Sequence, residues 1–317
     1  MVKEPLFLEP EFKERIWGGK KLKEQFNYDL PSSTTGECWG ISAHPNGPST
    51  VRNGSLKGKT LIELWENHRE LFSNEKGEQF PLLVKILDAN QDLSVQVHPD
   101  DRYAATYENG ELGKNECWYV VDCDPDSKLV LGHNANTKEE FVSMIEAGKW
   151  DELFKSVPIK PGDFYYVPSG TVHAIRKGAV ILETQQSSDT TYRVYDYDRT
   201  DDQGAKRELH IQQSIEVTTI PHVNVNVKQE VAQEGGLKIT KLVSEHYFTV
   251  YHGALDGYVM KRTDGKYLLF SVLEGDGELV VEEKNYSLKK GDHFIIPSTV
   301  PQFEMTGTVQ LIFSHTS

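Results

Sequence analysis

The feature that most constrains the fold is a glycine–proline–histidine pattern at residues 160–176, which read K-P-G-D-F-Y-Y-V-P-S-G-T-V-H-A-I-R. Gly162 and the aspartate after it indicate a turn, and the β-rich residues 164–167 predict a strand. Pro168 and the next glycine end that strand and reverse the chain, so that His173 begins a new strand. A histidine at the start of a barrel strand can point into the barrel mouth, where a metal ion or substrate lies. The alternative is a packed core histidine.

A second copy of this pattern lies near the C-terminus, in the stretch K-K-G-D-H-F-I-I-P-S-T-V-P-Q-F. When Gly291 is aligned with Gly162, Pro297 falls on Pro168, at a separation of 291 − 162 = 129 residues. The position of the histidine is filled by Gln302 or by the proline before it. This separation is too long for a solenoid repeat and predicts a duplicated domain in which only the first copy keeps its ligand.

Length and charge limit what the protein can do. A chain of 317 residues suggests about two domains, and its net charge of −14 argues against nucleic acid or an anionic membrane as a partner. An anionic substrate would therefore need a local positive pocket. The sequence predicts no membrane span and no signal peptide, because the apolar runs are short and the start is charged. Three cysteines without C-x-x-C spacing predict reduced thiols and a cytoplasmic protein, for which we expect a monomer.

The expected organisation is a catalytic N-terminal domain at residues 1–221 and a C-terminal domain at residues 222–317 without metal ligands. Helical insertions are predicted in the first domain, at residues 60–72, 100–107, 137–154 and 209–217. The second domain consists almost entirely of short strands separated by turn signals, which is typical of a compact antiparallel barrel or sandwich.

A candidate metal site is indicated by the strand L-S-V-Q-V-H, where alternation places Gln96 and His98 on one face, about 7 Å apart. Glu116 begins a later predicted strand and His173 the strand described above. These four residues suit Zn²⁺ and could also hold Fe²⁺, Mn²⁺ or Co²⁺. The amide is a weak ligand, which suggests an exchangeable coordination position. The alternative is a polar strand that faces solvent.

These motifs resemble a known family. The glycine–proline–histidine stretch resembles the second cupin motif, and four motifs together resemble type I phosphomannose isomerase (mannose-6-phosphate isomerase) in its short bacterial form: L-S-V-Q-V-H-P-D, K-N-E-C-W-Y, Y-V-P-S-G-T-V-H-A-I and Q-Q-S-S-D-T-T-Y-R-V-Y-D-Y-D-R. The resemblance extends from R-I-W-G-G-K to the end of the chain. The glycine pattern of the generic first cupin motif is absent, and the reduced helical insertions leave open how the pocket is covered.

The resemblance implies a mainly β tandem cupin (jelly-roll) fold with helical insertions and an enzyme of carbohydrate metabolism. The implied reaction is a zinc-dependent aldose–ketose isomerisation between mannose 6-phosphate and fructose 6-phosphate, which runs through an enediol. By motif position, one Zn²⁺ per chain is held by Gln96, His98, Glu116 and His173, and Arg193 acts in the active site.

The reaction needs a base, a group that stabilises an oxyanion and an anchor for the phosphate. Arg193 could stabilise the enediolate, unless it only pairs with a neighbouring aspartate. Lys114 shares a strand face with Glu116 and could bind phosphate or act as the base. Ser94 and Lys85 are candidate phosphate contacts, with a solvated surface position as the alternative. The base stays open between a zinc-bound water, Lys114 and a carboxylate.

Two other functions fit the same residues. His98, His173 and Glu116 could form the two-histidine, one-carboxylate face of an iron-dependent cupin oxygenase. A non-catalytic, sugar-binding bicupin is the third possibility.

Overall fold

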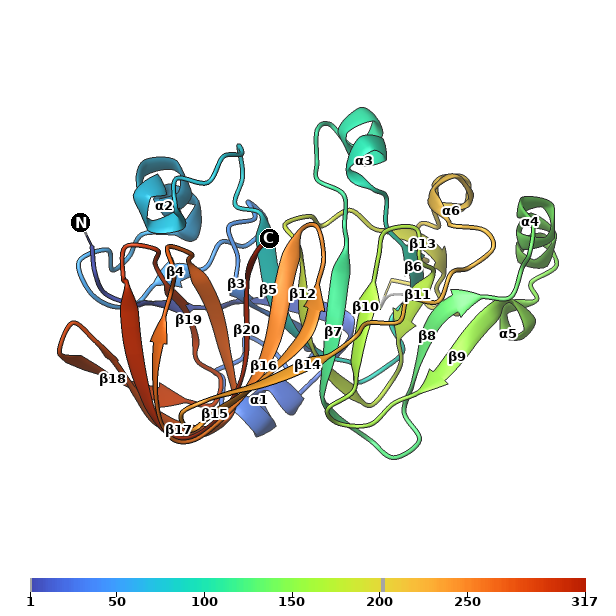
Figure 1. The fold of residues 1–317 in the computed structure, drawn as a ribbon. Helices are drawn as coiled ribbons and strands as arrows, with labels where there is room; N and C mark the ends of the chain where they lie inside the picture. Colours follow the sequence, from blue (N-terminus) through green and yellow to red (C-terminus); the bar gives the residue numbers. More distant parts are fainter. Residues whose placement is uncertain (1, 201–202) are drawn as a thin grey trace.

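The structure, a computed structural model, describes residues 2–200 and 203–317. Within these residues the strands form three antiparallel sheets in two β halves that lie side by side (Figure 1). The expectation of a mainly β protein is confirmed.

The N-terminal half contains a six-stranded and a five-stranded sheet. In spatial order, the first consists of β10 (Phe164–Val167), β7 (Glu116–Cys123), β12 (Ala179–Gln186), β5 (Leu82–Asp88), β3 (Thr35–Ile41) and β2 (Glu11–Gly19). The second consists of β13 (Tyr192–Tyr195), β6 (Val95–Val97), β11 (His173–Ile175), β8 (Lys128–His133) and β9 (Phe154–Pro158). One buried cluster contains side chains of both sheets, among them Val120 and Ile181 from the first and Leu129 and Ile175 from the second. The two sheets therefore pack face to face around a shared interior.

The C-terminal half is a nine-stranded sheet. Its strands are β14 (Glu230–Glu234), β15 (Leu237–Ser244), β16 (Phe248–Arg262), β20 (Gln302–Thr316), β17 (Leu268–Val281), β18 (Lys284–Lys289), β19 (His293–Ile296), β1 (Leu6–Glu9) and β4 (Thr50–Val51). The last two come from the start of the chain, and β1 pairs with β19 in the register Leu6↔Ile295. The largest buried cluster also joins side chains from both halves, such as Leu82 and Leu269. The division at residue 221 stays a prediction, and the opening segment contributes strands to the C-terminal sheet.

The two copies of the glycine–proline pattern form the same turn. Gly162 and Gly291 both adopt a φ of +89°, which favours glycine. The Gly162 amide donates to the Val120 carbonyl at 2.8 Å, and the Gly291 amide donates to the Val272 carbonyl at 2.9 Å. The internal duplication is therefore visible in the backbone, with β7 and β10 in the first half equivalent to β17 and β19 in the second.

Helices lie at the edges of the two halves, in or near the expected ranges (Figure 1). They are α2 (Leu61–Asn67) with the 3₁₀ helix η1 (Arg69–Phe72), α3 (Asp101–Tyr107), α4 (Lys138–Glu146), α5 (Trp150–Leu153) and α6 (Ile211–Val217). The last begins two residues later than expected, because the His210 amide donates to the Arg193 carbonyl at 2.8 Å and stays attached to β13. The sequence analysis missed α1 (Lys21–Phe26). None of the described helices is both long and apolar enough to cross a membrane.

Candidate active site and metal centre

Three predicted ligands converge inside the N-terminal half. His98 directly follows β6, Glu116 begins β7 and His173 begins β11. Their ligating atoms lie within 4.8 Å of one another, and all three side chains are buried. The Glu116 carboxylate lies between the rings, with Oε2 at 3.5 Å from His98 Nε2 and Oε1 at 3.3 Å from His173 Nε2.

Both imidazoles are oriented by backbone carbonyls. His98 Nδ1 donates to the Thr190 carbonyl at 2.8 Å, and His173 Nδ1 donates to the Thr171 carbonyl at 2.8 Å. Burial lowers the pKa of both histidines, to about 4 for His173, so that the rings are neutral near pH 7. In this tautomer each Nε2 carries a lone pair that faces Glu116, which is the orientation that metal ligation requires.

The chemistry of these groups fits a divalent cation. Glu116 Oε1 and His173 Nε2 are buried acceptors without a hydrogen-bond donor among the described residues, whereas Glu116 Oε2 is paired with the Lys114 ammonium. Leaving two facing acceptors unsatisfied in a buried site is costly, unless a cation binds there. Two imidazoles and one carboxylate are typical ligands of Zn²⁺.

Gln96, the fourth predicted ligand, lies next to this group. In the five-stranded sheet it is directly opposite His173 on β11 and Arg193 on β13. It also lines the cavity beside the three buried ligands. Its role as a ligand stays a prediction.

Lys114 is the nearest basic residue to the three ligands. Its Nζ is buried, 2.9 Å from Glu116 Oε2 and 3.0 Å from His98 Nε2. Burial alone would lower its pKa, but the negative charges of Glu116 and Glu183 outweigh burial and raise it. The side chain is therefore a charged ammonium group in this arrangement.

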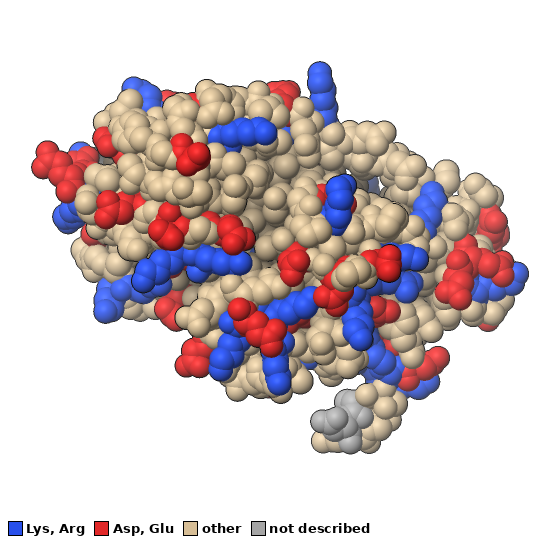
Figure 2. All heavy atoms as spheres, turned by 90° about the horizontal axis from the view of Figure 1, so that it is seen from below, with Lys and Arg blue, Asp and Glu red and all other residues tan. Residues whose placement is uncertain are grey.

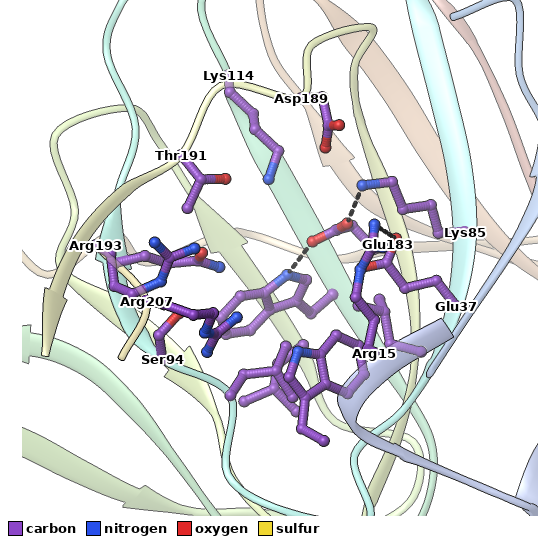
Figure 3. Close-up of a pocket in the computed structure, with 16 residues that line it drawn as sticks. Arg15, Glu37, Lys85, Ser94, Lys114, Glu183, Asp189, Thr191, Arg193 and Arg207 are labelled. Atoms are coloured by element: carbon purple, nitrogen blue, oxygen red, sulfur yellow. Dashed lines mark hydrogen bonds and ion pairs between the residues drawn. The ribbon is translucent and has the colours of Figure 1, made fainter. Parts of the chain in front are cut away.

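A cavity of about 330 Å³ opens beside these residues (Figure 3). Ten charged or hydroxyl-bearing side chains line it: Arg15, Glu37, Lys85, Ser94, Lys114, Glu183, Asp189, Thr191, Arg193 and Arg207. Five of them are basic and three are acidic. The cavity is therefore locally positive in a chain whose net charge is −14. On the face shown in Figure 2, by contrast, basic and acidic side chains are interspersed.

One wall of the cavity contains Ser94, Arg193 and Arg207 (Figure 3). Arg193 Nη1 donates to the Glu208 carbonyl at 2.8 Å, whereas its buried Nε has no partner within the described chain. The structure gives Arg193 no ion pair with a described acidic residue. Asp196 accepts instead from Arg207, at 2.8 and 2.6 Å. Arg193 is thus available to bind an anion in the cavity.

The opposite wall contains paired charges. Lys85 Nζ lies 3.6 Å from Glu183 Oε2, and Glu183 Oε1 accepts from the Trp118 indole at 3.0 Å. Arg15 binds Glu37 with two hydrogen bonds, of 2.8 and 3.2 Å. Lys85 is buried and lies across the cavity from Ser94 (Figure 3), so the two candidate phosphate contacts do not form one cluster.

Sequence reasoning did not assign a site role to six of these residues: Arg15, Glu37, Glu183, Asp189, Thr191 and Arg207. One usable signal existed for Glu183, a charged residue within the apolar strand A-V-I-L-E-T. No local pattern distinguishes the others from polar surface residues.

Comparison with known proteins identifies relatives along almost the whole chain. Residues 6–123 match the family described as "Phosphomannose isomerase type I, catalytic domain", and residues 238–316 match "Mannose-6-phosphate isomerase, cupin domain". The chain is 54% identical to the mannose-6-phosphate isomerase ManA of Bacillus subtilis, over 99% of this chain and 100% of that protein. It is 55% identical to the mannose-6-phosphate isomerase of Streptococcus mutans, over 99% of both.

Solved structures give the same result. The crystal structure of the mannose 6-phosphate isomerase from Bacillus subtilis matches with a TM-score of 0.97 and 53% identity, over 99% of this chain and 100% of that one. A variant of the phosphomannose isomerase from Salmonella typhimurium shares the fold, with a TM-score of 0.79 at 16% identity. The expected tandem cupin fold is confirmed, and the chain belongs to the type I phosphomannose isomerase family.

Proposed function

We propose that this protein is a metal-dependent isomerase that interconverts mannose 6-phosphate and fructose 6-phosphate, with one Zn²⁺ per chain. The observation that carries the proposal is the buried group of two histidines and one glutamate beside a positive cavity, in a chain of this family. His98, Glu116 and His173 would hold the ion, with Gln96 as the fourth ligand. The bound ion would supply Lewis-acid polarisation of the sugar oxygens at C1 and C2.

Charges in the cavity support the binding of a sugar phosphate. Arg207 and Arg193 lie near Ser94 on one wall, which makes this wall the better phosphate anchor. Arg193 presents a planar, permanently charged group, which could also stabilise an enediolate oxygen. Lys85 is paired with Glu183 and would position that carboxylate.

The isomerisation moves a proton between C1 and C2 of the open-chain sugar. Lys114 and Glu183 both face the cavity near the ligands, and either could exchange this proton. Lys114 is already protonated in this arrangement and could only donate a proton, so the proposal limits the general base to Glu183 or a water bound to the ion. Buried tryptophan and leucine side chains that line the cavity would exclude bulk water from the enediol.

The test is a coupled assay of purified protein with mannose 6-phosphate, before and after chelation. We expect activity to be lost with the metal and restored by Zn²⁺. Arg193→Ala should abolish most of the turnover, whereas Arg102→Ala, on the exposed side of α3, should not change it. Oxygen uptake that depends on added Fe²⁺, without isomerisation, would instead establish the oxygenase. Binding without turnover would establish the non-catalytic bicupin.

The remaining expectations belong to the same proposal. The three cysteines of the protein are free thiols, which supports a location in the reducing cytoplasm. We propose a monomer, and a light-scattering mass of one chain in solution would support that assignment.

A further inference from the structure

The duplication allows the active site to be compared, residue by residue, with the same place in the C-terminal half. Val120 and Val272 accept the hydrogen bonds of the two equivalent turns, so they are equivalent residues. The strands that contain them, β7 and β17, can therefore be aligned residue by residue from these two valines. Lys114 lies six residues before the first valine (120 − 114), and Lys266 lies six before the second (272 − 266). Lys266 is therefore the equivalent of the active-site lysine.

By the same count, the metal ligand Glu116 is replaced by Leu268, four residues before its valine (120 − 116 and 272 − 268). The pairing confirms this register, because β10 joins Val167 to Glu116 and β19 joins Ile296 to Leu268. The C-terminal half thus has a buried leucine where the N-terminal half has the carboxylate between two histidines. Without that carboxylate, the equivalent place is unsuited to a divalent cation.

A third position is also exchanged. Glu183 of β12 is paired with Trp118, and Phe313 of β20 is paired with Phe270. Trp118 and Phe270 are equivalent, since each lies two residues before its valine (120 − 118 and 272 − 270). Phe313 therefore occupies the place of the Glu183 carboxylate.

The partner of that carboxylate changes with it. Lys85 is paired with Glu183 across the strands, and Tyr251 is paired with Phe313. The Lys85–Glu183 ion pair, at 3.6 Å, is thus replaced by a stacked aromatic pair with ring centroids 4.7 Å apart and an interplanar angle of 12°. The charged wall of the first site has become an aromatic wall.

A cavity of about 410 Å³ lies at these positions, lined by Lys266, Leu268, Tyr251 and Phe313 among others. This volume is in the range of small-molecule sites, about 300–1,000 Å³. Lys266 Nζ lies 3.3 Å from the buried His315 ring and has no carboxylate partner among the described residues. Burial lowers the pKa of His315, so its imidazole is neutral near pH 7. His315 Nδ1 donates to the Thr316 carbonyl at 2.6 Å, so Nε2, 3.4 Å from Lys266 Nζ, is the ring atom that can accept from the lysine.

Three further basic residues around this cavity already have acidic partners. The pairs are Lys241–Glu230 at 2.7 Å, Lys261–Glu234 at 2.8 Å and Arg262–Asp264 at 3.2 Å. Among the described residues that line the cavity, Lys266 is thus the lysine or arginine left for an anionic ligand. The rest of the interior offers an aromatic and aliphatic wall, which suits the C–H face of a sugar ring.

We propose that the C-terminal half contains a second ligand site, which binds a phosphorylated monosaccharide without converting it. Lys266 holds the phosphate, and Tyr251 and Phe313 contact the sugar. The missing metal ligand prevents the isomerisation chemistry there. Binding at this second site does not require catalysis in the N-terminal half, so this proposal is separate from the proposed activity.

The test is calorimetric titration of the intact protein, loaded with Zn²⁺, with a hexitol 6-phosphate, which has no carbonyl group and cannot be isomerised. We expect two binding events per chain. Arg193→Ala should remove the event in the N-terminal cavity, and Lys266→Ala should weaken the other by about tenfold or more. Lys266→Glu should remove that second event. Lys284→Ala, an exposed lysine on β18, controls for the loss of one positive charge and should retain both.

Three outcomes would overturn the proposal: one binding event in the wild type, two undiminished events in Lys266→Glu, or inorganic phosphate binding as tightly as the hexitol phosphate. The last would mean that the aromatic wall contributes nothing to recognition. Because binding is measured apart from catalysis, an inactive protein with two binding events would refute the proposed isomerase and leave the second site intact.

Discussion

Tyr247, in the turn between β15 and β16, connects the C-terminal half to the segment between α3 and Glu116. Its hydroxyl donates to Asp101 Oδ2 at 2.7 Å, and Asp101 begins α3. Asp101 Oδ1 accepts from the Gly113 amide at 2.8 Å and from the Gln186 side chain at 2.9 Å. Gly113 directly precedes Lys114. A continuous set of hydrogen bonds therefore runs from the second half to the start of the strand that carries the central ligand.

Tyr247→Phe removes one hydrogen bond to a charged acceptor and keeps the aromatic ring. Such a bond contributes about 1.5–3 kcal/mol when fully buried. Both side chains here are only partly buried, so water replaces part of the bond and we expect a loss of about 1–2 kcal/mol. The melting temperature should fall by about 1.5–3 °C, since the entropy of unfolding is about 2.1 cal/mol/K per residue.

We expect kcat to fall by about three- to tenfold, because the loop before Lys114 loses one of its anchors and about 1.4 kcal/mol corresponds to tenfold in rate. Steady-state kinetics with mannose 6-phosphate and a chelator competition for the metal measure the two effects. Tyr107→Phe is the matched control, since that tyrosine is 66% exposed. It should change neither kcat nor metal affinity.

A double-mutant cycle with Asp101→Asn tests the path itself. If Tyr247 acts through Asp101, the effects of the two changes on kcat should be clearly less than additive. The reasoning is refuted if Tyr247→Phe lowers the melting temperature while kcat and metal affinity stay at the wild-type values. In that case the hydrogen bond stabilises the fold without positioning the ligands.

Three further predictions concern buried groups. Glu116→Gln keeps the shape of the ligand but removes its charge, so metal content after dialysis should fall by about tenfold or more, measured by elemental analysis, together with activity; full retention of metal would contradict the assignment. A thiol reagent should react in the native protein with the half-buried Cys123 before the buried Cys38 and Cys117; burial raises the thiol pKa of all three, so access of the reagent decides the order. Fast reaction of all three would contradict this order. Burial, and next the charge of Arg52, lowers the pKa of His293 from 6.5 to about 3, so the unfolded chain binds an additional proton between these pH values. The free energy of unfolding should fall as the pH falls below about 6.5, by up to about 1.4 kcal/mol per pH unit from this group. Denaturant titrations at several pH values measure this, and the free energy of unfolding of His293→Gln should depend less steeply on pH than that of the wild type.

Local patterns predicted the parts of the site that depend on a single segment. Alternation in the strand around Gln96 and His98 is a backbone property, and so is the positive φ of Gly162 in the turn before β10. The start of β11 at His173 likewise follows from the proline and glycine before it. These features are decided by neighbours in the sequence, and the structure agrees with them.

Features that depend on long-range packing were not predictable in this way. Arg193 was expected either to face the substrate or to pair with an aspartate. The outcome depends on Arg207, which binds Asp196 and leaves Arg193 without it. Lys85 was considered a phosphate contact or a surface residue, yet it is buried against Glu183. In each case the deciding partner is brought in by another strand or loop, so spacing in the sequence carries no signal of it.

The pairing of β1 with β19 ties the order of folding to the direction of synthesis. Residues 6–9 are synthesised long before their hydrogen-bonding partners at residues 293–295. The C-terminal sheet therefore cannot be completed until residues 293–295 have left the ribosome. A fragment that begins at residue 222 would expose the unpaired edge of β19 and tend to aggregate.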